Sequence, residues 1–213
     1  MSGERAARKS NVVVNGVDVD QIIGTIDAVR AAPALAKFTF RISNRWIDGG
    51  QNRTTIRGFW GAGAENDREP FVLDSDEPYL MFGEDQAPNP IEYLMHALAA
   101  CVTTSFVYQA AMRGVRIEAM ESRIEGEIDM QGMFGASDDV RNGFENLMVC
   151  LRVKADCSAE MLEELCGMAR RRSPVLDVVS RPVSVSVSCE PLQDNGVESI
   201  TTSTSFSIKG DTP

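Results

Sequence analysis

The side chains of this 213-residue chain best suited to chemistry are its thiols. The number of cysteines is odd and none are spaced as CxxC, a pattern that fits neither a secreted disulfide framework nor a zinc site. Cys101 is the most interesting of the five, because small neighbours such as Ala99 and Ala100 leave its sulfur accessible. Free cysteine is also a common core residue, so periodicity alone favours a buried structural role for Cys101.

Motifs of the common enzyme classes are missing from the sequence, which contains no GxSxG, HExxH, GxxxxGK[ST] or post-strand GxGxxG pattern. Neither a cofactor nor a metal ion is therefore predicted. His96 is the single histidine and lies five residues before Cys101. That spacing is about 140° around a helix, so the two side chains point apart and a Cys–His dyad is not expected. We interpret His96 as a core or interface residue.

The sequence around Cys101 predicts a long helix over about residues 89–113. Asn89 is a good N-cap, Pro90 suits the first helical position, Glu92 completes a capping box, and Gly114 ends the helix. The stretch is long and apolar enough to cross a bilayer. Because it also contains polar residues and has strand-like sequence on both sides, we interpret it as a buried core helix and expect no membrane partner.

Shorter elements flank this helix on both sides. A helix is predicted from about Asp18 to Pro33, and a second helix from Ser158 to Pro174. Alternating apolar residues predict strands at about 38–43, 53–60, 71–73, 115–129, 147–153, 183–187 and, more weakly, 198–207, with loops at 61–70 and 131–142. This order indicates an α+β fold with helices against one face of a sheet. We expect an N-terminal extension with a short helix at 1–37 and one domain at 38–213.

Charge and targeting signals restrict the partners and the compartment. The formal net charge of -10 repels phosphate backbones, so a nucleic-acid partner is not expected. The densest basic run, residues 170–172, ends the second predicted helix, where it complements the helix dipole. The polar N-terminus shows no secretory signal, and free thiols suit a reducing cytosol, so we expect a cytoplasmic protein.

The segment from Ala87 to Cys101, APNPIEYLMHALAAC, resembles the signature of the OsmC/Ohr family of cysteine-based hydroperoxide reductases. In that family an N-P-x-E-x-L-L-x-A-L-A-x-C segment opens the long central helix and delivers the reactive cysteine. The segments 76–78, 83–85 and 173–175 are also similar to family segments, and the resemblance covers roughly residues 38 to 190. It implies that residues 38–213 form an OsmC-like domain, with antiparallel sheets packed against the central helix and a second helix in an intertwined homodimer.

The resemblance also implies a chemistry, the reduction of organic hydroperoxides in oxidative stress defence. A thiolate attacks the distal peroxide oxygen and becomes a sulfenic acid, which a second cysteine converts to a disulfide that an external dithiol reduces. A nearby cation lowers the pKa of such a thiol. In the family this cation is an arginine of the N-terminal hairpin, held by a glutamate at the start of the long helix.

By this resemblance Cys101 takes the reactive position and Ser173 replaces the second cysteine. Because a hydroxyl cannot form a disulfide, the resemblance implies a one-cysteine mechanism resolved by an external thiol. Arg53 is our first choice for the cation, with Arg45 and Arg57 as alternatives.

Two further residues are ambiguous. Glu92 lies nine residues before Cys101, as in OsmC-like branches, whereas Ohr-like members have their glutamate at the position of Ile91. Nine residues is about 180° around a helix, so we slightly favour a capping role for Glu92. Cys166 lies about 10 Å along its helix from Ser173, beyond the Cα separation of about 7 Å that a disulfide allows, so we interpret it as a core residue.

Two functions are therefore weighed against each other. The first is a peroxidase whose apolar pocket at the dimer interface holds a small hydrophobic peroxide or another apolar ligand, with Phe59, Trp60, Phe106 and Met133 as candidate lining residues. The alternative is a non-catalytic binding or interaction protein that keeps the fold but has lost turnover. The loss of the second cysteine favours the alternative, and the retention of Cys101 favours the enzyme.

Overall fold

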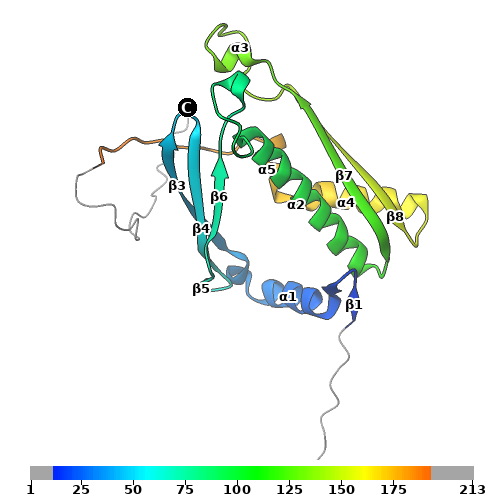
Figure 1. The fold of residues 1–213 in the computed structure, drawn as a ribbon. Coiled ribbons are helices and arrows are strands. Elements are labelled where there is room, and N and C mark those ends of the chain that lie inside the picture. The colour runs from blue at the N-terminus through cyan, green and yellow to red at the C-terminus, as the bar shows by residue number, and fades with distance from the viewer. Residues whose placement is uncertain (1–11, 193–213) are drawn as a thin grey trace, which may run out of the picture.

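The computed structural model describes residues 12–192, in which helix α2 lies between two antiparallel sheets (Figure 1). The elements are, in chain order, β1 (Val13–Val14), β2 (Val17–Asp18), α1 (Val19–Ala31), η1 (Pro33–Ala36), β3 (Phe38–Asp48), β4 (Gln51–Gly61), β5 (Ala64–Asn66), β6 (Phe71–Ser75), η2 (Tyr79–Met81), α2 (Pro90–Met112), β7 (Ile117–Glu127), α3 (Met130–Met133), β8 (Asn146–Ala155), α4 (Ala159–Arg172) and α5 (Pro174–Ser180). The α+β class predicted from the sequence is confirmed.

Helix α2 begins with the capping box expected from its sequence. The Asn89 side chain accepts the Glu92 backbone N–H at 2.8 Å, and Glu92 Oε2 accepts the Asn89 backbone N–H at 2.9 Å. These bonds satisfy two N–H groups that the first helical turn leaves without partners.

One face of α2 builds the core with α4 and the sheet of β7 and β8. Leu98, Val102, Phe106 and Leu165 are each at most 4% exposed, and apolar side chains of both strands pack on this cluster. By length and composition alone α2 could cross a bilayer, but only 28% of its most apolar window is buried in this chain. An apolar helix that is covered on one face only requires a partner for the other.

The second sheet contains the hairpin of β3 and β4, with β5 and β6 paired to β4. Gly49 turns the hairpin with a φ of 46°, a conformation that glycine adopts without strain. Because side chains alternate across a strand, the register places a set of apolar side chains on one face. We call this the aromatic face, formed by Phe38, Phe40, Ile42, Trp46, Phe59 and Phe71.

The aromatic face has no cover within residues 12–192. Phe40 is 71% exposed and Trp46 is 69% exposed, although the rings of Phe38, Phe40 and Phe59 pack against one another. Contiguous apolar surface of this kind is typical of an interaction site.

Several predicted elements differ in the structure. The strand predicted at 183–187 is wrong: residues 182–192 form no strand, and Val185 and Val187 are 77% and 92% exposed. A strand needs a neighbour for its backbone hydrogen bonds, and the described part of the chain supplies none here. The candidate at 198–207 lies outside the described residues. The two predicted loops contain the short elements β5 and α3.

Helix α4 ends before Pro174 as predicted, and a further helix that the sequence did not predict starts there. Ser173 leaves the helical conformation between α4 and α5, and Pro174 occupies the first position of α5. Proline suits that position because its missing N–H would have no helical partner there.

The N-terminal segment adds an unpredicted hairpin, β1 and β2, before α1. Its two-residue turn is Asn15-Gly16, with φ values of 53° and 76°. Such an Asn-Gly pair is a strong hairpin signal. Helix α1 itself follows the prediction, with Asp18 as its N-cap.

Candidate functional site

Cys101 lies midway along α2 and is half-buried. Its sulfur has no hydrogen-bond partner among the described residues. Leu94 and Tyr108, seven residues before and after it, share its side of the helix and are 37% and 46% exposed. The thiol therefore lies on the face of α2 that the described residues leave largely uncovered.

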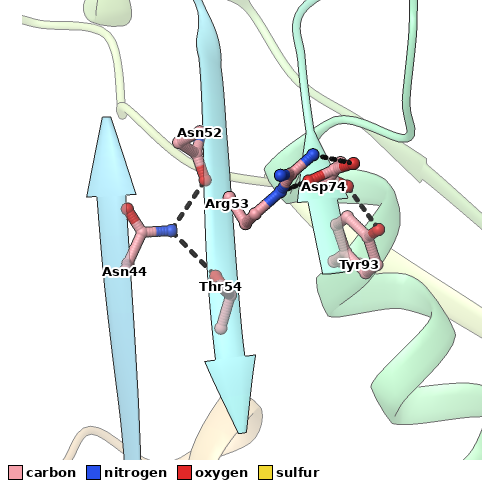
Figure 2. Close-up of polar contacts among 6 residues, drawn as sticks. All are labelled: Asn44, Asn52, Arg53, Thr54, Asp74 and Tyr93. Carbon is pink, nitrogen blue, oxygen red and sulfur yellow. Dashed lines mark hydrogen bonds and ion pairs between the residues drawn. The ribbon is translucent and has the colours of Figure 1, made fainter. Parts of the chain in front are cut away.

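Arg53 extends from β4 across the sheet to Asp74 of β6 (Figure 2). Its Nε and Nη2 lie 2.6 Å and 3.0 Å from the two carboxylate oxygens of Asp74, a side-on bidentate pair. The hydrogen bond from Arg53 holds the pKa of Asp74 below its usual value, against partial desolvation, and the same pair raises the pKa of Arg53. Arg53 is thus a fixed cation with a carboxylate partner.

The site of this pair is tied to the start of α2. Tyr93 Oη donates a hydrogen bond of 2.6 Å to the backbone carbonyl of Asp74 (Figure 2). Tyr93 lies eight residues before Cys101, so β6, the strand that holds Asp74, is attached to the helix that carries the thiol. Asn44 bridges Asn52 and Thr54 beside this pair on the same sheet, at 2.7 Å and 2.8 Å.

The alternative arginines occupy other positions on the hairpin. Arg45 lies opposite Arg53 in the register and is exposed. Arg57 is also exposed, and its carbonyl accepts a hydrogen bond from Arg68. Among residues 12–192, no arginine reaches the sulfur of Cys101 with a hydrogen bond. Within one chain the structure therefore does not bring the predicted cation and the thiol together.

Glu92 acts as the cap of α2, and Arg53 takes Asp74 instead as its carboxylate partner. Sequence reasoning missed Asp74 and Tyr93. Asp74 directly follows the apolar strand predicted at 71–73, and Tyr93 lies between capping and core residues, so neither stands out by pattern. Their roles come from strand register and helix docking, which are not local properties of the sequence.

Ser173 is 2% exposed at the junction of α4 and α5, both of which contact α2. Its Oγ accepts the backbone N–H of Leu176 at 3.2 Å, so it is the N-cap of α5. The hydroxyl therefore already has a structural role where the family resemblance expects a second cysteine.

The loop before α2 is organised by a buried carboxylate. Asp76 is 1% exposed and accepts backbone N–H groups of Glu77, Glu84 and Gln86. Burial opposes its ionisation, but these bonds outweigh burial, so the pKa of Asp76 lies below its usual value. Gly83 is required beside it, since a Cβ there would lie 1.9 Å from the Glu77 carbonyl oxygen.

Glu77, the neighbour of Asp76, has the opposite character. Its Oε2 is buried without a hydrogen-bond partner in the described part of the chain. Burial raises its pKa, and the negative charges of Asp76 and Glu92 raise it further. Glu77 therefore resists ionisation, whereas the neighbouring carboxyl group of Asp76 ionises more readily than usual.

The remaining candidates are placed as follows. Cys166 and Cys157 pack against the core, as predicted for Cys166, while Cys150 and Cys189 are exposed. Phe106 is buried in the core of its own chain, so it cannot line an open pocket as predicted. His96 is exposed on α2 and is not a core residue. Residues 12–192 contain no cluster of three His, Cys, Asp or Glu side chains that could hold a metal ion.

Comparisons of the sequence and of the structure with known proteins point to the same family. The model of the OsmC-like protein family matches residues 83–188. An OsmC-like protein from Mycoplasma pneumoniae aligns over 68% of this chain and 89% of its own, with a TM-score of 0.50 and 14% identity. No curated protein matches significantly in sequence.

Two further solved structures have similar coverage. The organic hydroperoxide resistance protein OsmC from Legionella pneumophila covers 66% of this chain and 89% of its own, with a TM-score of 0.46 and 15% identity. An OsmC-like protein of unknown function from Vibrio cholerae covers 65% and 91%, with a TM-score of 0.47 and 11% identity.

Proposed function

Because this chain belongs to the OsmC-like protein family, we propose that Cys101 reduces organic hydroperoxides by a one-cysteine mechanism in the cytoplasm. The observation that carries the proposal is the placement of Cys101. Its thiol is half-buried on an uncovered apolar face of α2, without an internal polar partner that would occupy the sulfur. An accessible thiol with apolar surroundings suits an alkyl hydroperoxide better than hydrogen peroxide, which gains nothing from apolar burial.

The active unit we propose is a homodimer. Two apolar surfaces lack cover within residues 12–192 of one chain, the aromatic face of the hairpin and the Cys101 side of α2. A second copy offers both surfaces again, so a two-fold pairing covers them reciprocally. In such a dimer the hairpin of one subunit packs near the Cys101 of its partner, and Arg53 is its candidate cation, on the face of the hairpin opposite the aromatic face.

The proposed reaction proceeds in two stages. The Cys101 thiolate attacks the distal oxygen of the hydroperoxide, the O–O bond breaks, and the leaving alkoxide takes a proton to become an alcohol. Cys101 is left as a sulfenic acid. An external thiol then condenses with it, releasing water and forming a mixed disulfide, and a second thiol reduces that disulfide. Ser173 takes no covalent part because its oxygen cannot form a disulfide.

One set of observations supports a second candidate, a non-catalytic binding protein with the same fold. The Ser173 hydroxyl caps α5, and the positive charge of Arg53 is paired with the carboxylate of Asp74. A protein of this kind would bind an apolar ligand beside Cys101 without oxidising the thiol.

Peroxide consumption distinguishes the two candidates. The wild-type protein is assayed with cumene hydroperoxide and hydrogen peroxide, using dithiothreitol and thioredoxin as reductants, beside Cys101→Ser and the matched core variant Cys166→Ser. We expect faster consumption of the organic peroxide, lost in Cys101→Ser and kept in Cys166→Ser. Folded wild-type protein that consumes no peroxide and forms no dimedone adduct at Cys101 would establish the binding protein instead.

The dimer has its own test in light scattering. Trp46→Asp places a charge on the aromatic face, and Met148→Asp places one on the outer side of β8, where Met148 is 60% exposed. We expect a dimer for wild type and Met148→Asp and a monomer for Trp46→Asp. A monomeric wild-type protein at micromolar concentration would contradict the proposal.

A further inference from the structure

A cavity of about 640 Å³ separates α1 from the C-terminal half of α2. Helix α1 contributes Ile22, Thr25 and Ile26, and α2 contributes Ser105, Tyr108 and Met112. The volume lies within the range of small-molecule sites, about 300–1,000 Å³. Ser105 follows Cys101 by one turn, but Cys101 itself does not line the cavity, which extends toward the N-terminal segment.

The chain fixes α1 in position to form this cavity. Asn15 donates from Nδ2 to the Val115 carbonyl at 2.9 Å and accepts the Ile117 N–H at 2.9 Å. These two bonds join the turn before α1 to the start of β7, about a hundred residues later. The cavity wall is therefore anchored to the folded domain by specific hydrogen bonds.

The charges around the cavity are unequal. Among residues 12–192, Arg172 at the end of α4 is the only basic residue that lines the cavity, and it forms no ion pair with any of them. Asp18 also lines the cavity, but its carboxylate accepts the Gln21 N–H as the N-cap of α1. Most of the remaining wall is formed by aliphatic and aromatic groups. A guanidinium beside apolar walls complements a carboxylate at the end of a hydrocarbon chain.

We propose that this cavity binds an aliphatic monocarboxylate, with its chain between α1 and α2 and its carboxylate on Arg172. The site does not use the Cys101 thiol, but Ser105 and Tyr108 lie on the side of α2 that the proposed dimer covers, so the second copy must leave this end of α2 open. It uses α1, which belongs to the segment predicted to lie outside the family domain, so the ligand site is a feature of this chain.

Calorimetric titration of the full-length Cys101→Ser protein with decanoate tests the site, because that variant lacks the thiol on which the proposed peroxidase chemistry depends. Decanol serves as the uncharged probe, and both are used below their micelle or solubility limits. We expect one decanoate per chain, bound at least tenfold more tightly than decanol. Arg172→Gln should weaken decanoate about tenfold and leave decanol unchanged, while Arg172→Lys keeps most of the affinity.

Arg171→Gln is the matched control, because it removes the same charge from the same helix end without touching the cavity. It should bind both probes as the parent does. Thr25→Trp, which fills the cavity from an exposed position on α1, should abolish binding of both. Equal affinities for decanoate and decanol, an unchanged Arg172→Gln, or no binding at all would overturn the proposal. None of these results depends on peroxidase activity, so failure here and failure of the proposed function are distinguishable.

Discussion

Arg53 and Asp74 are paired side-on across adjacent strands, with Nε and Nη2 of the arginine directed at the two carboxylate oxygens (Figure 2). This geometry leaves Nη1 free to donate to a further anion. Both side chains are about half exposed, so the pair contributes little to folding. The pair instead positions the arginine, because Asp74 fixes the direction in which the remaining N–H groups of Arg53 point.

The first prediction concerns the reactivity of Cys101 in the proposed dimer. Arg53→Gln removes the proposed cation, and because a neighbouring cation favours the reactive form of a thiol, alkylation at pH 7 should slow by about tenfold. Asp74→Asn removes the compensating negative charge but keeps a hydrogen-bond acceptor, so alkylation should accelerate. The rate is measured by mass spectrometry of the Cys101 peptide after iodoacetamide treatment.

Arg45→Gln is the control for this series, because Arg45 lies opposite Arg53 on the same hairpin without a carboxylate partner among the described residues. Its alkylation rate should stay within about twofold of wild type. Identical alkylation rates in Arg53→Gln and Arg45→Gln would show that Arg53 does not act on Cys101.

Elements with strong local signals were predictable from the sequence. The capping box at Asn89 and Glu92 fixed the start of α2 to the residue, and the turn at Gly49 located the hairpin. Cys101 was singled out by its small neighbours and by the family resemblance. In each case the determining groups lie within a few residues of one another.

Features that depend on distant residues were missed or misread. Val183, Val185 and Val187 alternate like a strand, but a strand also needs a neighbouring edge, which the described chain lacks at that point. The pairing of Arg53 with Asp74 follows from the register of β4 and β6, and no sequence spacing reveals it. Glu92, for which the sequence slightly favoured a capping role over pairing with the arginine, caps α2.

The second prediction tests the structural role of Ser173. Ser173→Ala leaves the Leu176 N–H without its acceptor at a buried helix start, and the free energy of unfolding should fall by about 1–2 kcal/mol. Ser158→Ala removes the comparable cap of α4 at an exposed position and should cost about 0.5–1 kcal/mol. Urea unfolding measures both. Equal losses would mean that burial adds nothing at Ser173.

The third prediction concerns oxidation of a variant with a second cysteine. Ser173→Cys restores the family pattern, so one equivalent of cumene hydroperoxide should convert Cys101 and the new thiol to a disulfide. Wild-type protein should instead retain a sulfenic acid that dimedone traps. Thiol counting and mass spectrometry read both products. A persistent sulfenic acid in Ser173→Cys would place residue 173 out of reach of Cys101.

The fourth prediction concerns the anchor of α1. Asn15→Gly keeps a residue that tolerates the positive φ but deletes both side-chain hydrogen bonds, so stability should fall by about 1–3 kcal/mol. Amide exchange in α1 should accelerate more than exchange in α4, and decanoate should bind less tightly. Unchanged protection of α1 would show that Asn15 is not its anchor.

The last prediction concerns Glu77 and the pH dependence of stability. Its folded-state pKa is raised by burial and by the charges of Asp76 and Glu92, so the native protein binds more protons than the unfolded chain above pH 4.5. Stability from this group is then present below the unfolded pKa and lost as pH rises through the folded value. Glu77→Gln removes the charge, so its unfolding free energy at pH 7 should exceed that of wild type by about 1 kcal/mol.

Glu84→Gln, in the same loop but exposed, should follow the wild-type curve. Asp76 has the opposite sign, because its pKa is lowered, and its contribution is lost on acidification in all three proteins. Denaturant unfolding from pH 4 to pH 8 measures these curves, and a Glu77→Gln protein that is less stable than wild type at pH 7 would show that the Glu77 carboxylate is needed in its charged form.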